Sequence, residues 1–159
     1  MDNEKQKDYT RRVSQANRTE LVVITYDIIL DYIRDALDAV ERDVPEDVRS
    51  SAKQARRFLE ELISVLDFRY SVSKQLLSLY GYVQRILVGS EMSGRDRGLE
   101  DAGNVIFRLR EAFAQIVPQD ASGAVMENTQ TIFAGLTYGK GSLNETEIGG
   151  GASKRGFFA

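Results

Sequence analysis

The chain contains no cysteine and no histidine, and these two absences narrow the chemistry open to it. Without cysteine it forms no disulfide, which favours a reducing cytoplasm over an extracellular setting. Without histidine it lacks the commonest general base and metal ligand. Together the absences exclude the usual structural zinc sites and the di-iron bundles built on Glu-x-x-His. We therefore expect no metal and no other cofactor, and we do not expect an enzyme.

Long apolar runs and a strong net charge are also missing. No stretch approaches the roughly 20 apolar residues of a membrane-spanning helix, and the N-terminus has no apolar signal region. The net charge of −3 provides no broad basic surface for nucleic acid. Among 159 residues 42% are hydrophobic and only two are proline, which is typical of one globular domain. These features predict a cytoplasmic protein that works by binding another protein.

Hydrophobic residues recur with helical spacing in four segments, which predicts amphipathic helices at 19–42, 46–68, 71–88 and 95–117. Asn17 or Thr19 is expected to cap the first helix, and Pro45 to lie in the first turn of the second. The stretch 89–94 and Pro118 should end the third and fourth helices. Because the connections are short, the predicted fold is all-α, an antiparallel up-down four-helix bundle.

The two ends of the chain differ from this helical part. Residues 1–118 are predicted to hold the bundle and a short N-terminal arm, whose basic residues should be solvated. Residues 119–159 contain eight of the thirteen glycines and are predicted to form a mostly irregular tail, in which only 125–136 favours a short helix. Four apolar residues of this tail are expected to occupy a groove of the bundle when no partner is bound: Ile132, Phe133, Leu136 and Tyr138.

The first predicted helix has more apolar surface than the core of a bundle needs. Its charged residues, which are four aspartates with Arg34, Glu41 and Arg42, fall in a stripe about 120° wide. An apolar arc of about 200° covers most of the rest, against roughly 100° in an ordinary surface helix. This surplus predicts an exposed apolar groove that binds a partner. The acidic stripe is interpreted as a solvated helix face, with cation binding as the alternative, and consists of Asp27, Asp31, Asp35 and Asp38.

Three motifs in the expected order resemble the FliS family of flagellar export chaperones. The segment 9–27, YTRRVSQANRTELVVITYD, resembles the N-terminal signature of the family through Tyr9, Val13, Ala16, Leu21, Tyr26 and Asp27. The segment 76–87, LLSLYGYVQRIL, resembles its Leu-Tyr-x-Tyr helix. The last helix of the family is matched by Leu109, Arg110, Ala112 and Phe113. The resemblance extends over about residues 9–117, while the tail has no counterpart and the Thr-Ala-Ser-Pro of the family is replaced by residues 15–18.

The resemblance implies a non-catalytic cytoplasmic chaperone. Its partner would be the C-terminal helical segment of flagellin, bound as helices in an apolar groove so that flagellin does not polymerise before export. The flagellar export machinery would be a second partner. The departures from the motifs leave a divergent paralogue with another client as an alternative, and the wide apolar arc also fits a bundle that self-associates as a homodimer.

Nine residues are candidates for the partner-binding surface. Tyr9 either covers the groove, contacts the export machinery or staples the arm to the bundle. Val13 and Leu21 favour packing roles, whereas Tyr26 and Tyr80 favour core positions with their hydroxyl groups at the rim. The remaining four lie off the expected core stripes and would complete the groove: Leu77, Tyr82, Val88 and Phe107.

Overall fold

The computed structural model describes residues 1–126, and every regular element in that range is a helix. Its helices are α1 (Asn3–Gln15), α2 (Arg18–Glu41), α3 (Pro45–Ser64), α4 (Ser71–Ser93) and α5 (Leu99–Ile116), followed by the 3-10 turn η1 (Val117–Gln119). No strand occurs among these residues, so the predicted all-α class is confirmed. Within the same range no helix combines the length and the apolarity needed to cross a membrane.

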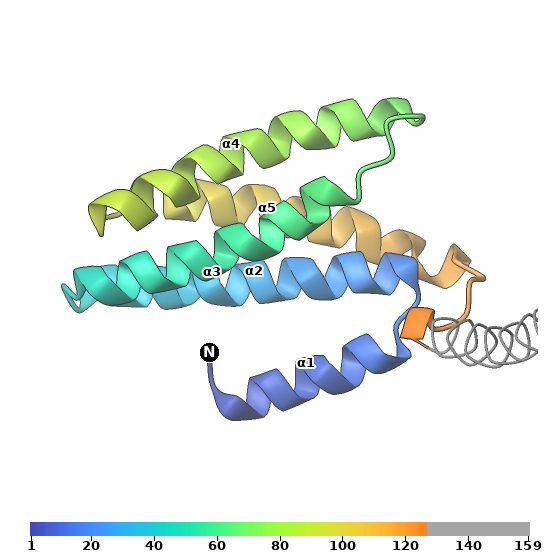
Figure 1. Cartoon of the computed structure of the whole chain (residues 1–159), viewed down its shortest axis with the longest axis horizontal. Coiled ribbons are helices and arrows are strands. Elements are labelled where there is room, and N and C mark those ends of the chain that lie inside the picture. The colour runs from blue at the N-terminus through green and yellow to red at the C-terminus, as the bar shows by residue number, and fades with distance from the viewer. Residues whose placement is uncertain (127–159) are drawn as a thin grey trace, which may run out of the picture.

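Helices α2 to α5 form the body of the protein, and we call them the helical body. Successive helices run in opposite directions, as Figure 1 shows. Helix α2 packs against α3 and α5, α3 against α4, and α4 against α5. The core between them is apolar and includes Ile29, Leu59, Val83, Leu87, Leu99 and Ile106.

Two tyrosines meet at the centre of this core. Tyr26 on α2 and Tyr80 on α4 are 0% and 2% exposed, and their hydroxyl oxygens lie 2.5 Å apart in a hydrogen bond. Burial is the main cause that raises the pKa of each phenol above its usual value. The tyrosines are core residues as expected, but their hydroxyl groups satisfy each other inside the protein instead of reaching the rim.

The starts of α2 and α3 follow the expected local signals. Asn17 caps α2, because its side chain accepts from the Glu20 backbone N–H while the Glu20 carboxylate accepts from the Asn17 N–H. Pro45 opens α3, where its missing N–H costs nothing. Of the two predicted caps, Asn17 is therefore confirmed and Thr19 lies inside the helix.

Three predicted boundaries are wrong. Helix α4 does not break at 89–94 but continues to Ser93 and ends at Gly94, whose φ of 65° is left-handed. Helix α5 begins at Leu99 rather than at 95, because Asp96 accepts the backbone N–H groups of residues 98 and 99 at 2.8 Å each. Helix α3 ends at Ser64, four residues before the predicted end.

The N-terminal arm is the largest correction to the fold. Residues 3–15 form the helix α1, with Asp2 accepting from the Glu4 N–H as its cap. The pattern of 3–15 did not predict this helix, because its residues are mostly polar. The short helix predicted at 125–136 lies, apart from its first two residues, outside the residues that the structure describes.

A candidate helix-binding site beneath the first helix

Helix α1 lies along the outside of α2 and is the least embedded of the five α-helices. None of its thirteen residues is buried, whereas nine residues of α2 are. Figure 1 shows α1 set apart from α2 to α5, joined to them at the turn before α2. The surface that α1 covers is therefore the place to look for a binding site.

The surface beneath α1 is apolar. Ala16, Ile24 and Ile28 form a small buried cluster that is separate from the main core. Tyr32 of α2 and Phe58 of α3 continue this surface and stack on each other, with ring centroids 6.0 Å apart and an angle of 22° between the planes. The half-buried side chains that pack on the cluster are Met1, Tyr9, Val13, Leu21, Tyr32 and Phe58.

A hollow that is open to solvent lies between α1 and this surface. It has a volume of about 500 Å³ and is bordered by Tyr9 and Val13 on α1, Ile28 and Tyr32 on α2, and Phe58 on α3. Because these side chains are mainly apolar, we call it the apolar cavity. Its size suits several more apolar side chains than α1 itself provides.

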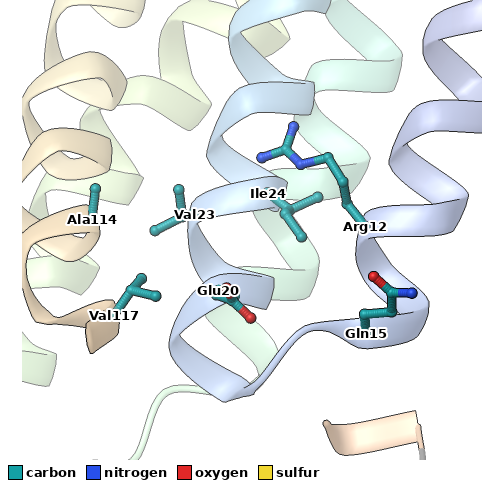
Figure 2. A pocket seen from close by; sticks show the side chains of 7 residues that line it. All are labelled: Arg12, Gln15, Glu20, Val23, Ile24, Ala114 and Val117. Carbon is teal, nitrogen blue, oxygen red and sulfur yellow. The ribbon is translucent and has the colours of Figure 1, made fainter. Parts of the chain in front are cut away.

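A second hollow lies on the other flank of α1, towards α5. It has a volume of about 470 Å³. Figure 2 shows Arg12 and Gln15 approaching it from α1, with Val23 of α2 facing Ala114 and Val117 across it. Helix α1 thus lies on α2 with unfilled space along both sides.

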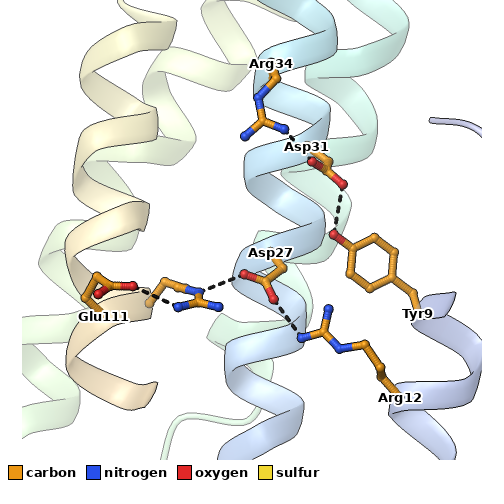
Figure 3. A network of polar contacts seen from close by, with 7 residues as sticks. Tyr9, Arg12, Asp27, Asp31, Arg34 and Glu111 are labelled. Carbon is orange, nitrogen blue, oxygen red and sulfur yellow. Dashed lines mark hydrogen bonds and ion pairs between the residues drawn. The ribbon is translucent and has the colours of Figure 1, made fainter. Parts of the chain in front are cut away.

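Polar contacts, rather than close apolar packing, hold α1 in place. The Tyr9 hydroxyl donates to the Asp31 carboxylate at 2.9 Å, and Arg12 donates to Asp27 at 2.8 Å, as Figure 3 shows. Lys5 lies 3.2 Å from Asp31. Burial of the Tyr9 ring and its hydrogen bond to Asp31 raise the pKa of the phenol far above its usual value.

Both carboxylates also have partners within the helical body. Asp27 accepts from Arg110 of α5 at 2.9 Å, and Asp31 accepts from Arg34 on its own helix at 2.8 Å. The hydrogen bond to Asp27 raises the pKa of Arg110. The side chain of Asp31 is only 11% exposed.

The interpretation of the acidic stripe as a solvated face is therefore wrong for Asp27 and Asp31, which bind α1, and correct for Asp38, which is exposed. The basic residues of the arm are not all solvated either, since Lys5 and Arg12 pair with this stripe. Among the described residues no group of three or more side chains is arranged to hold a metal ion.

The structure brings together three of the nine candidate residues. Tyr9, Val13 and Leu21 pack on the same small cluster beneath α1. Tyr26 and Tyr80 lie in the main core and are not presented at the surface in this structure. The five residues therefore divide between the covered surface and the interior.

The other four candidates do not form one groove with them. Tyr82 is 39% exposed and lines a shallow hollow with Val105 of α5. Phe107 is two residues further along α5, about 160° around the helix from Val105, so it faces away from that hollow. Leu77 and Val88 are placed on α4, where Leu77 is 39% exposed and Val88 half-buried, about 140° and 120° around the helix from Tyr82.

Ile28, Tyr32, Phe58 and Met126 line the apolar cavity and were missed as site residues. The wide apolar arc of α2 was the signal for Ile28 and Tyr32. Phe58 recurs with helical spacing among the apolar residues of 46–68, a pattern that predicts a core position, and no pattern in the sequence linked Met126 to this surface.

Comparison with known proteins gives the family. The family model described as "Flagellar protein FliS" matches residues 1–120 of the chain. The flagellar secretion chaperone FliS of Bacillus subtilis (strain 168) is 25% identical over 108 residues, which cover 68% of this chain and 81% of that protein. The chain belongs to the FliS family, as the motif resemblance indicated.

Proposed function

We propose that the chain is a non-catalytic cytoplasmic chaperone that binds the C-terminal helical segment of flagellin and keeps it from polymerising before export. Membership of the FliS family and the name of the B. subtilis relative support the role in flagellar secretion. The binding site would be the surface beneath α1, where a helix of the client replaces α1 against α2 and α3.

The observation that carries this proposal is the mismatch between α1 and the surface beneath it. The surface is apolar and leaves a hollow of about 500 Å³, yet Tyr9 and Val13 are the only apolar side chains with which α1 lines it, the others being polar. Helix α1 has no buried residue. A surface built for α1 alone would be filled by α1. The mismatch indicates that α1 occupies the position of a more apolar helix.

The replacement of α1 by a client helix is favourable by the usual free energies of apolar burial. An amphipathic client helix presents apolar side chains at i, i+3 or i+4, and i+7. Each leucine-sized side chain that fills the cavity contributes roughly 1.5–3 kcal/mol. Three additional side chains, worth about 4.5–9 kcal/mol together, therefore outweigh the three polar contacts that Tyr9, Arg12 and Lys5 of α1 make, which are partly exposed and worth about 1 kcal/mol each.

Titration calorimetry with a peptide of the flagellin C-terminal segment tests the proposal. We expect binding, and we expect Tyr32→Ala to weaken it because Tyr32 lines the apolar cavity. Tyr82→Ala is the matched control, since Tyr82 is a surface tyrosine of α4 outside the site. Absence of binding at tens of micromolar peptide would refute the function, and equal effects of the two variants would refute the site.

Self-association is a second candidate, favoured by apolar side chains around the α3–α4 connection. Val65, Phe68, Tyr70 and Val72 are each more than half exposed there. Such a patch fits burial against a second copy. Light scattering over a concentration series, with and without the flagellin peptide, tests self-association. A dimer that persists when the peptide is bound uses this patch, because the surface beneath α1 is then occupied by the peptide.

A further inference from the structure

The chain does not leave the protein after α5 but returns to the junction of α1 and α2. Asp120 accepts from the Thr19 backbone N–H at 3.1 Å and from the Thr19 hydroxyl at 2.7 Å. Val125 donates its N–H to the Ala16 carbonyl oxygen at 3.0 Å. We call residues 117–126 the strap, because they attach the end of α5 to the start of α2.

Asp120, at the centre of the strap, accepts hydrogen bonds from Ser122 as well as from Thr19. Hydrogen bonds from Ser122 and Thr19 hold the pKa of Asp120 well below its usual range. Asp120 therefore stays ionised at neutral pH and remains a strong acceptor at the N-terminal turn of α2, where a negative charge is favoured.

The strap ends at the apolar cavity. Met126 lines that cavity together with Tyr9 and Val13 of α1 and with Phe58 of α3. The chain therefore delivers its last described residue to the surface where the proposed client helix would bind. Thirty-three residues, 127–159, follow from this point.

We propose that the segment after Met126 occupies the apolar cavity through Ile132, Phe133 and Leu136, and that it competes there with the client. The competition rests on the proposed function, but the docking does not. The strap places the segment at the cavity, and the cavity has room for apolar side chains that α1 does not supply.

The length and composition of the segment fit this occupant. Ile132 follows Met126 by six residues and Leu136 by ten, so the chain holds their Cα atoms within about 20 Å and about 35 Å of that of Met126. In a helix, residues at the spacing of Ile132, Phe133 and Leu136 would fall within an arc of about 100°. From 127 to 138 the only charged residue is Glu127, so little charge has to be desolvated when the segment enters the cavity.

The tether makes even weak docking effective. A short flexible connection gives an effective concentration of about 1 mM. If the untethered segment bound with a dissociation constant of about 0.1 mM, the tether would fill the cavity about nine-tenths of the time. Client binding would then weaken about tenfold, in proportion to the fraction of molecules with a free cavity.

The docking is tested without any client. Because the chain has no cysteine, Thr131→Cys allows a single paramagnetic label next to the apolar residues. In the full chain we expect the label to broaden the methyl signals of Val13 and Ile28 more strongly than in the same labelled chain that also carries Ile132→Ser and Phe133→Ser, because the tether is identical in the two chains. Equal broadening of Val13 and Ile28 in the two chains would overturn the docking.

The competition is tested with the flagellin peptide. The double variant Ile132→Ser, Phe133→Ser in the full chain should bind the peptide up to about tenfold more tightly, and so should a chain ending at Met126. Ile148→Ser is the control for loss of an apolar residue elsewhere in the tail and should change nothing. Equal affinities of the full chain and both altered forms would overturn the competition.

The two proposals fail in different ways. If no form of the protein binds the peptide, the proposed function fails, while the broadening of Val13 and Ile28 still decides whether the segment docks. If the peptide binds and the broadening is equal in the two labelled chains, the function stands and the inference about the segment is wrong.

Discussion

Replacing Arg12 by alanine should loosen α1 and thereby strengthen client binding. The Arg12 guanidinium donates to Asp27 at 2.8 Å and lies 5.5 Å from the centre of the Tyr9 ring. The side chains of Arg12 and Asp27 are 36% and 16% exposed, so solvent screens the pair only in part. The substitution removes both contacts and leaves the helical body intact.

The size of the effect follows from these two contacts. A partly exposed ion pair contributes about 0.5–1 kcal/mol, and the cation–π contact adds about 0.5 kcal/mol. Asp27 keeps its hydrogen bond from Arg110, so no carboxylate is left without a partner. The total of about 1–1.5 kcal/mol corresponds to a roughly fivefold to tenfold larger population of molecules with α1 undocked.

Hydrogen exchange and calorimetry measure the two consequences. Amide exchange in α1 should accelerate by about that factor while exchange in α2 to α5 is unchanged, and the flagellin peptide should bind up to tenfold more tightly. Arg11→Ala is the matched control, because Arg11 is the neighbouring residue and pairs with Asp8 on the same helix. If both variants exchange at the same rate, polar anchoring of α1 by α2 is refuted.

Three other predictions concern stability. Tyr26→Phe leaves the buried Tyr80 hydroxyl without its partner and should lower the free energy of unfolding by about 1–3 kcal/mol in urea, whereas Tyr82→Phe should not. Because burial raises the pKa of Tyr26, its phenol ionises at lower pH in the unfolded chain than in the folded one. In thermal melts its contribution to stability should therefore be constant below about pH 10 and decrease as the pH rises further. Tyr26→Phe should reduce this decrease. Gly94→Ala should lower the melting temperature, because φ at Gly94 is 65° and the added Cβ would lie 2.9 Å from the Cβ of Pro45. Gly123→Ala should leave the melting temperature unchanged, because no atom lies within 4 Å of the added Cβ.

Periodicity predicted the helical body because each of its helices buries a continuous apolar face. It failed at 89–93, where Gly89 and Ser90 read as a break. Ser90 is fully buried, and its hydroxyl accepts from the Arg97 N–H at 3.2 Å, so packing against the next segment keeps the helix intact. It failed again for α1, whose position is set by the acidic stripe of another helix.

From the sequence, the candidate site was predicted only as a surplus of apolar surface on α2. The wide apolar arc of α2 indicated a binding surface, and Tyr9, Val13 and Leu21 lie on it. Whether an exposed side chain on α4 or α5 joins that surface depends on which flank of the helix it occupies relative to its neighbours. A helical pattern does not contain that information, which is why the sequence grouped Tyr82 and Phe107 although the structure separates them.

The shortness and polarity of α1 also set a time scale. A thirteen-residue helix is marginal on its own, so α1 melts when it leaves α2 and re-forms on docking in about a microsecond. At about micromolar concentration and an association rate constant of about 10⁶ M⁻¹s⁻¹, another molecule arrives only about once per second. After a chaperone releases its client, α1 would therefore dock again on the apolar surface long before another protein molecule could bind there.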